Sequence, residues 1–223
     1  MASERAVTNS WLEGDIIITS HQTSGKGQRG ISCESEPDQN LTFSIIIKPK
    51  ILEVVIQFDL TIAVSLGITT FLNTLKPGFK IKWPNDIYFG ERKICGILIQ
   101  NNLKGKFLDT SIIGIGLNIN QNKLDNPKAT SLAQNLNKKQ NLPHILEGVC
   151  LSVEAKYLQL KSNQIAPMKD EYLSQLLGIG EPRSFESEHT FQGKIMGVSS
   201  TGKLIINVGN SLQEFDLKEI KFL

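Results

Sequence analysis

Residues 79–98 read Phe-Lys-Ile-Lys-Trp-Pro-Asn-Asp-Ile-Tyr-Phe-Gly-Glu-Arg-Lys-Ile-Cys-Gly-Ile-Leu. Apolar side chains alternate with lysines over 79–83, which predicts a strand that ends at Pro84. Apolar runs on either side of Gly90 then predict a hairpin with arms at 87–89 and 93–100. A single lysine, Lys93, therefore stands just ahead of a glycine and an apolar run.

Outward from this hairpin, the pattern alternates between strands and helices. Strands are expected at 15–20, 41–48 and 107–120, with a turn at 101–106. The long apolar stretch from Phe58 to Leu75 is too long for one strand and predicts a largely buried helix. Further helices are expected at 1–13, from Pro143 to Leu160, and from a capping Asp170 to Leu177.

A break at 178–182, rich in glycine and ending in proline, separates this part from a smaller one. After the break, only short strands are expected, at 184–188, 191–198, 203–208 and 212–217. We therefore predict an α+β protein with a catalytic domain at 1–182 and a small barrel at 183–223.

Composition excludes several classes of protein. The 223 residues are 40% hydrophobic and carry a net charge of +2, so nothing in the balance demands nucleic acid as a partner. No apolar run approaches the ~18 residues that a membrane span needs, and no secretory signal opens the chain. The three cysteines are widely spaced and form no C-x-x-C pair. We expect a soluble, reduced, cytoplasmic protein without a membrane partner.

A second polar stretch, Ser24-Gly25-Lys26-Gly27-Gln28-Arg29-Gly30, fits the G-x-G-x-x-G pattern of dinucleotide sites. A dinucleotide site needs a helix directly after the glycines, because the helix N-terminus binds the pyrophosphate. Turn-forming residues and another strand follow here, so the pattern does not indicate a nicotinamide or flavin site. Two alternatives stay open: a flexible hairpin tip, and a loop whose backbone N–H groups and cations wrap an anion. Taken with Lys93, the loop suggests a site where a nucleotide phosphate activates a carboxylate.

These segments resemble biotin–protein ligases in order and spacing. The resemblance rests on the glycine loop at 25–30, Lys82-Trp83-Pro84-Asn85-Asp86, Lys93-Ile94-Cys95-Gly96-Ile97-Leu98, the stretch 113–120 and Thr130-Ser131-Leu132. It covers nearly the whole chain and implies a mixed sheet with helices on one side, like the core of class II aminoacyl-tRNA synthetases. An SH3-like barrel is implied at the C-terminus.

The resemblance implies a two-step reaction. Biotin is activated by ATP to biotinyl-5′-AMP, with Mg²⁺, and is then transferred to a lysine of a biotin carboxyl carrier protein. Small-molecule substrates, no nucleic acid and a homodimer formed by pairing sheet edges belong to the same expectation.

Residue roles are carried over by position in the motifs. Lys93 would lie between the biotin carboxylate and the α-phosphate, where a cation is needed, with Lys26 as a second catalytic cation. The biotin-binding set is Gln22, Gly25, Lys26, Gly27, Gln28, Lys93, Gly96 and Gly116. The ATP-binding set is Arg29, Gly30, Lys82, Asn85 and Asn118. Asp86 would help to hold Mg²⁺ together with Asn85, or the two residues would form an Asx turn.

Departures from the family pattern are visible at three places. Lys26 and Gln28 stand where many members have arginine, and Cys33 stands where a tryptophan is common, so a stacking surface for adenine would be lost. The chain is expected to begin just after a Ser-Thr-Asn segment that contributes to the biotin pocket, which would weaken biotin affinity. Without a DNA-binding winged helix, we predict no repressor activity.

Two rival functions remain. One is a lipoate– or octanoate–protein ligase or transferase of the same fold, and the other is a non-catalytic adaptor that binds carrier protein.

Overall fold

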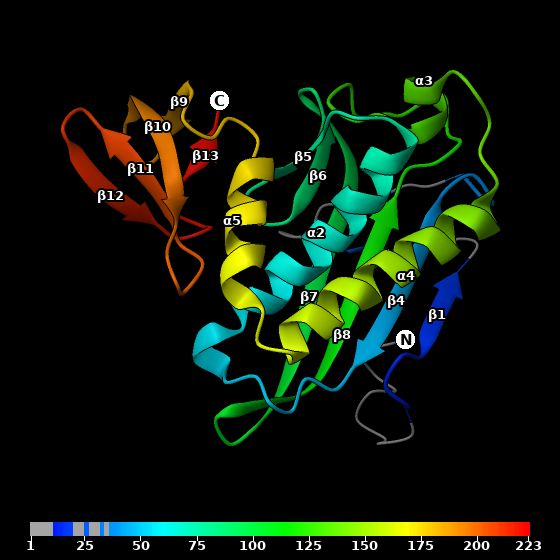
Figure 1. Cartoon of the computed structure of the whole chain (residues 1–223). Coiled ribbons are helices and arrows are strands. Elements are labelled where there is room, and N and C mark those ends of the chain that lie inside the picture. Colours follow the sequence, from blue (N-terminus) through cyan, green and yellow to red (C-terminus); the bar gives the residue numbers. More distant parts are fainter. Residues whose placement is uncertain (1–10, 20–24, 27–31, 34–35) are drawn as a thin grey trace.

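The computed structural model describes residues 11–19, 25–26, 32–33 and 36–223, and of 25–26 and 32–33 only the backbone. Its larger sheet has six strands in the order β1-β4-β8-β7-β6-β5 (Figure 1). The strands are β1 (Ile16–Thr19), β4 (Leu41–Ile47), β5 (Phe79–Lys82), β6 (Asp86–Phe89), β7 (Arg92–Lys104) and β8 (Phe107–Leu117). All five strand pairs are antiparallel, so the expected mixed sheet is in fact antiparallel, with only isolated parallel bridges.

Three helices cover one face of this sheet: α2 (Phe58–Leu75), α4 (Leu142–Lys161) and α5 (Ile165–Gln175) (Figure 1). Helix α2 has the predicted bounds and is largely buried. It approaches α4 closely because Gly67 has no side chain: a Cβ there would lie 2.6 Å from the Cα of Val153. Any larger residue at position 67 would push the two helices apart.

Helix α2 corrects one expectation. With the preceding 3-10 turn η3 (Val54–Ile56), it forms a stretch, Val54–Leu75, that is long and apolar enough by composition to cross a membrane. Just over half of that stretch is buried against the sheet and the neighbouring helices. A core helix passes the same test, so the composition of α2 is weak evidence for a span.

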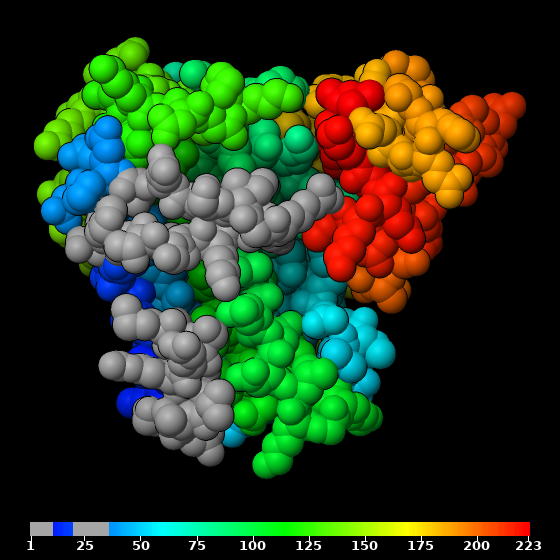
Figure 2. Space-filling model, turned by 180° about the vertical axis from the view of Figure 1, so that it is seen from behind, coloured from blue at the N-terminus to red at the C-terminus, as the bar shows by residue number. Residues whose placement is uncertain are grey.

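A second sheet of five strands has the order β12-β11-β10-β9-β13. Its strands are β9 (Pro182–Glu186), β10 (Thr190–Val198), β11 (Leu204–Val208), β12 (Ser211–Phe215) and β13 (Lys221–Phe222). Phe185 is fully buried at its centre, with the rings of Phe191 and Phe222 packed against it. Seen from behind, this sheet lies beside the larger one (Figure 2).

Two local predictions were wrong, and a third, the helix at 1–13, fails in the part of it that the structure describes. The turn expected at 101–106 is two residues wide, because β7 runs on to Lys104 and the chain reverses at Gly105 with φ +62°. Asp170 lies inside α5 and does not cap it. Within the described part of 1–13, residues 11–13 form no helix. The short helix α3 (Leu132–Leu136) and strand β13 were not predicted.

The glycine loop lies between two short paired strands, β2 (Gly25–Lys26) and β3 (Ser32–Cys33). No helix follows at 32–33 or in the turn at 37–39, so the dinucleotide pattern lacks its helix within the described residues. The remaining loop residues, Gln22, Gly27, Gln28, Arg29 and Gly30, lie outside the described part of the chain.

Candidate functional site

One row of residues crosses the larger sheet on the face opposite the helices. Thr19 pairs with Thr42, Thr42 with Gly116, and Gly116 with Gly96. At the far edge, Lys82 pairs with Asp86, and a Cβ on Gly96 would lie 3.9 Å from the Asp86 Oδ1 atom. Because paired residues share a face, the predicted residues Gly116, Gly96, Asp86 and Lys82 lie side by side.

A bulge brings Lys93 to the same face. Along a regular strand, Lys93 and Gly96 would point to opposite faces, since side chains alternate. The pairing between β6 and β7 shifts here: Tyr88 pairs with Lys93, but Ile87 pairs with Cys95. The extra residue, Ile94, lets two consecutive side chains, Ile94 and Cys95, be buried and turns Lys93 toward the open face.

The Lys93 ammonium lies over Gly96 and forms an ion pair with Asp86. Its Nζ atom is 2.6 Å from Asp86 Oδ2, and the two side chains are 39% and 26% exposed. A Cβ on Gly96 would lie 3.3 Å from both Cε and Nζ of Lys93. A glycine at 96 therefore leaves room for the lysine side chain to lie flat across the strand.

The neighbouring Gly116 leaves open space above the sheet. A Cβ built there meets no atom of the described residues within 4 Å. Two paired glycines, Gly96 and Gly116, thus give a flat stretch of backbone next to a cation. A ligand can approach backbone closely at such a place.

Backbone and side-chain hydrogen bonds fix the start of β7. Lys93 N donates to Lys128 O, and Thr130 N donates to Lys93 O. The Asn118 amide Nδ2 donates to Thr130 O at 3.1 Å, and its backbone N donates to Ile94 O. Asn118 thus fixes the loop that contains Lys128 and Thr130, the backbone partners of Lys93. The sequence did not indicate this structural role.

Asn85 is buried away from the row. Its amide Nδ2 donates to Ile97 O at 3.2 Å, and its side chain is only 4% exposed. Among the described residues, the Asn85 Oδ1 atom has no hydrogen-bond partner, so Asn85 does not form the alternative Asx turn. An unsatisfied buried acceptor is uncommon in a folded protein and leaves Asn85 able to accept one more hydrogen bond.

Lys82 ends the row at the opposite edge from Thr19. Its ammonium lies 4.9 Å from the centre of the Tyr88 ring and 5.0 Å from that of Phe222. Neither ring contact was predicted from the sequence. Strand alternation from Lys82 and Asp86 could have placed Tyr88 on this face, but no local signal connects the distant Phe222 to it.

Acidic ligands for a metal are few in this region. No group of three histidine, cysteine, aspartate or glutamate side chains lies close enough together to hold a metal ion in the described part of the chain. Asp86 is the carboxylate of the row, and Lys93 already contacts it. A single carboxylate suits Mg²⁺ only when the ion arrives with phosphate ligands of its own.

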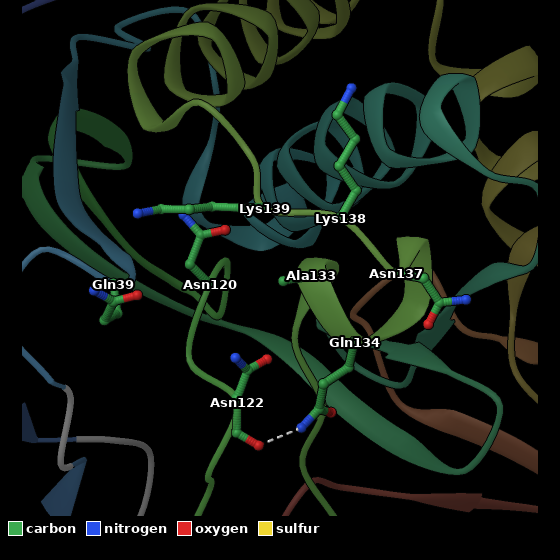
Figure 3. Close-up of a pocket in the computed structure, with 8 residues that line it drawn as sticks. All are labelled: Gln39, Asn120, Asn122, Ala133, Gln134, Asn137, Lys138 and Lys139. Atoms are coloured by element: carbon green, nitrogen blue, oxygen red, sulfur yellow. Dashed lines mark hydrogen bonds between the residues drawn. The ribbon is translucent and has the colours of Figure 1, made fainter.

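A hollow beside α3 lies away from this row. It has a volume of about 570 Å³, and none of the predicted site residues lines it (Figure 3). Its amides already serve the fold: Gln134 Nε2 donates to Asn122 O, and Asn120 exchanges two hydrogen bonds with Gln140. Size alone therefore does not make it the stronger candidate.

Comparison with known proteins gives consistent matches. Residues 2–118 match the family model described as the biotin/lipoate A/B protein ligase family. The chain is 29% identical to the bifunctional ligase/repressor BirA of Bacillus subtilis, over 96% of this chain and 67% of that protein. It is 24% identical to the biotin–[acetyl-CoA-carboxylase] ligase of Mycobacterium tuberculosis, over 92% of this chain and 77% of the relative.

A solved structure extends the likeness through both sheets. It is a biotin protein ligase from Aquifex aeolicus in complex with biotin and ATP, with a TM-score of 0.82 and 27% identity. The alignment covers 99% of this chain and 93% of the other.

Proposed function

Because the chain belongs to the biotin/lipoate A/B protein ligase family, we propose that it is a biotin–protein ligase. It activates biotin with ATP to biotinyl-5′-AMP and transfers the biotinyl group to a lysine of a biotin carboxyl carrier protein. The single observation that carries this proposal is the Lys93 ammonium lying over Gly96, beside the open backbone at Gly116. The names of the relatives and the biotin and ATP bound in the Aquifex structure support it.

In the first step, an oxygen of the biotin carboxylate attacks the α-phosphorus of ATP. The bond from that phosphorus to the bridging oxygen breaks, and pyrophosphate leaves. Two anions must approach each other, so a fixed cation where their charges meet lowers the barrier. Lys93 suits this place because its ammonium can leave Asp86 for the incoming carboxylate and phosphate without moving its backbone.

In the second step, a neutral lysine amine of the carrier attacks the acyl carbon. The bond from the acyl carbon to the AMP oxygen breaks, an amide forms, AMP leaves and the amine gives up a proton. The mixed anhydride is easily hydrolysed, so water must be kept away until the carrier docks. We assign this covering role to Lys26, Gly27 and Gln28 of the glycine loop. Gln22 and Gly25 are assigned to biotin binding, and Arg29 and Gly30 to binding of the ATP phosphates.

Mg²⁺ enters with the ATP phosphates as part of the substrate. Asp86 fits one inner or water-mediated contact to it, in keeping with the few protein carboxylates that Mg²⁺–nucleotide sites use. Once Lys93 turns to the substrates, the Asp86 carboxylate is free for that contact.

The finer architecture is also a proposal. We propose that the six-stranded sheet with its helices corresponds to the core of class II aminoacyl-tRNA synthetases, and that 183–223 form an SH3-like domain next to a catalytic domain at 1–182. We further propose that the protein is cytoplasmic and has no nucleic-acid partner. The net charge of +2 gives no support for nucleic-acid binding. Pairing of sheet edges in a homodimer is a further proposal, to be tested by light scattering.

The deciding experiment incubates the chain with ATP, Mg²⁺, radiolabelled biotin and a carrier domain. Labelled adenylate is expected without carrier, and labelled carrier when carrier is added. Carrier binding without either product would favour the adaptor function. Lipoate added as a competitor should not reduce the transfer of biotin to the carrier. If the carrier were modified with lipoate and not with biotin, the substrate would be lipoate and the proposal would be wrong.

A further inference from the structure

The amine of Lys82 lies between two aromatic rings that come from different sheets. Tyr88 is on β6 of the larger sheet, and Phe222 is on β13, the last strand of the smaller one. Both ring centres are within the distance at which a cation is attracted to the face of an aromatic ring. The three side chains therefore form a contact between the two sheets at the edge of the open face.

Partial burial of Lys82 strengthens its contact with the two rings. Burial lowers the pKa of Lys82, while the carboxylates of Asp86 and Glu91 oppose that shift. A lysine in this partly dry position has lost part of its hydration, so ring faces stabilise its ammonium more than they would in water. The two rings at the same time restrict the long, flexible side chain of Lys82 to one direction.

Phe222 is itself held firmly. It pairs with Phe185 in the strand register, and the two ring centres lie 5.2 Å apart. Phe185 is fully buried, so the ring of Phe222 rests on a fixed support. The position of Phe222 is thus set by the core of the smaller sheet.

The smaller sheet also holds the residue next to Lys82. The indole N–H of Trp83 donates to Gly202 O at 2.9 Å, in a buried hydrogen bond. Gly202 has φ +93°, and a Cβ there would lie 2.5 Å from the Phe58 ring, so this turn has little freedom. Consecutive residues at the end of β5 are therefore fixed by two separate contacts with the smaller sheet.

We propose that Phe222 is a positioning residue for the ATP half of the reaction, acting through Lys82. This rests on the proposed function: Lys82 provides a point charge for the phosphates of ATP, and the Tyr88 and Phe222 rings keep that charge at the edge of the row. The smaller sheet then contributes to adenylate formation through one ring, without touching the substrate.

The test compares four variants by calorimetric titration with Mg²⁺–ATP and by pyrophosphate release. Phe222→Leu keeps an apolar side chain in contact with Phe185 but removes the aromatic ring that faces Lys82. Phe222→Tyr keeps that ring. Phe191→Leu is the matched control, because Phe191 also stacks on Phe185, at 5.7 Å, and no lysine of the described residues lies over its ring. Lys82→Gln removes the cation that Phe222 is proposed to act through.

Phe222→Leu should raise the ATP dissociation constant and KM about three- to tenfold and leave the KM for biotin unchanged. Phe222→Tyr should behave like the wild type, and Phe191→Leu should lower the unfolding temperature only. In the Lys82→Gln background, Phe222→Leu should have no further effect on ATP binding.

Equal losses of ATP affinity in Phe222→Leu and Phe191→Leu would show that Phe222 only stabilises the smaller sheet, and would overturn the inference. So would an unchanged KM for ATP in Phe222→Leu, or an undiminished effect in the Lys82→Gln background. A wild-type chain that binds no ATP is a different result, because it would overturn the proposed ligase function itself and the inference with it.

Discussion

The ammonium of Lys93 lies directly over Gly96, with Nζ 3.3 Å from the point where a Cβ of residue 96 would be. The two residues share a face only because the strand pairing shifts between Ile87 and Tyr88. Bulges of this kind re-aim a side chain next to a functional site. Here the result is a cation above bare backbone, which is the arrangement that two anionic substrates need.

Replacing Lys93 by alanine should slow adenylate formation by at least about 100-fold, the usual loss when one charge-stabilising group is removed from an active site. The fold should persist, because the Lys93 side chain is 39% exposed and its ion-pair partner among the described residues, Asp86, is itself partly exposed. Pyrophosphate release and circular dichroism check the two parts. Lys104→Ala, at the far exposed end of the same strand, is the control and should react normally. Near-normal turnover by Lys93→Ala would remove Lys93 from the mechanism.

Gly96→Ala should impair the reaction without unfolding the protein. The added methyl group would lie 3.3 Å from Cε and Nζ of Lys93, tighter than ordinary contact, so the ammonium must move away from Asp86. We expect a higher KM for both substrates in steady-state kinetics. Gly197→Ala is the matched control, because Gly197 also lies in a strand, β10 of the smaller sheet, but a Cβ there meets no described atom within 4 Å. Equal kinetics for the two variants would argue against a tight fit at Gly96.

Trp83→Phe should lower the free energy of unfolding by about 1–3 kcal/mol, because the buried carbonyl of Gly202 loses its donor. Denaturant titration followed by circular dichroism measures the change. The chain offers a matched control in Trp11→Phe. The buried indole N–H of Trp11 has no hydrogen-bond partner among the described residues, so removing that N–H should cost far less. A larger loss in Trp11→Phe than in Trp83→Phe would contradict the importance of the bond to Gly202.

All three tyrosines should resist ionisation in the folded chain. Burial raises the pKa of Tyr88 to about 12, and burial likewise raises the pKa values of Tyr157 and Tyr172 above the usual 10.0. A raised tyrosine pKa means that the folded state holds protons that the unfolded state releases. Stability is therefore full below pH 10 and falls as pH rises toward 12.

Ultraviolet absorbance of tyrosinate, recorded beside circular dichroism, tests this. Little tyrosinate should form at pH 10 in the folded chain, whereas the chain in guanidinium should be about half ionised there. Half-developed absorbance at that pH with the fold intact would show that the tyrosines are exposed.

Much of the fold could be predicted, because its elements obey local rules. The apolar run 58–75 gave α2 with its observed bounds, and alternation placed the arms of the 87–100 hairpin correctly. The errors arose where local signals mislead. The polar run Asn101–Lys104 looks like a turn but pairs with β8, and α5 begins at Ile165, where the Gln164 side chain makes no capping hydrogen bond.

The candidate site divides in the same way. The chain itself determined which residue types are present: a cation before Gly96, a second glycine at 116, and a polar turn ending in Asp86. Tertiary structure decided which of them meet. One extra residue in β7 moved Lys93 to the face of the glycines. Strand register aligned residues of six strands into a row, and β13 brought Phe222 to Lys82 from 140 positions away along the chain. Residue chemistry is local and can be read in order, but the face and the neighbours of a side chain depend on pairing between strands, which no single segment encodes.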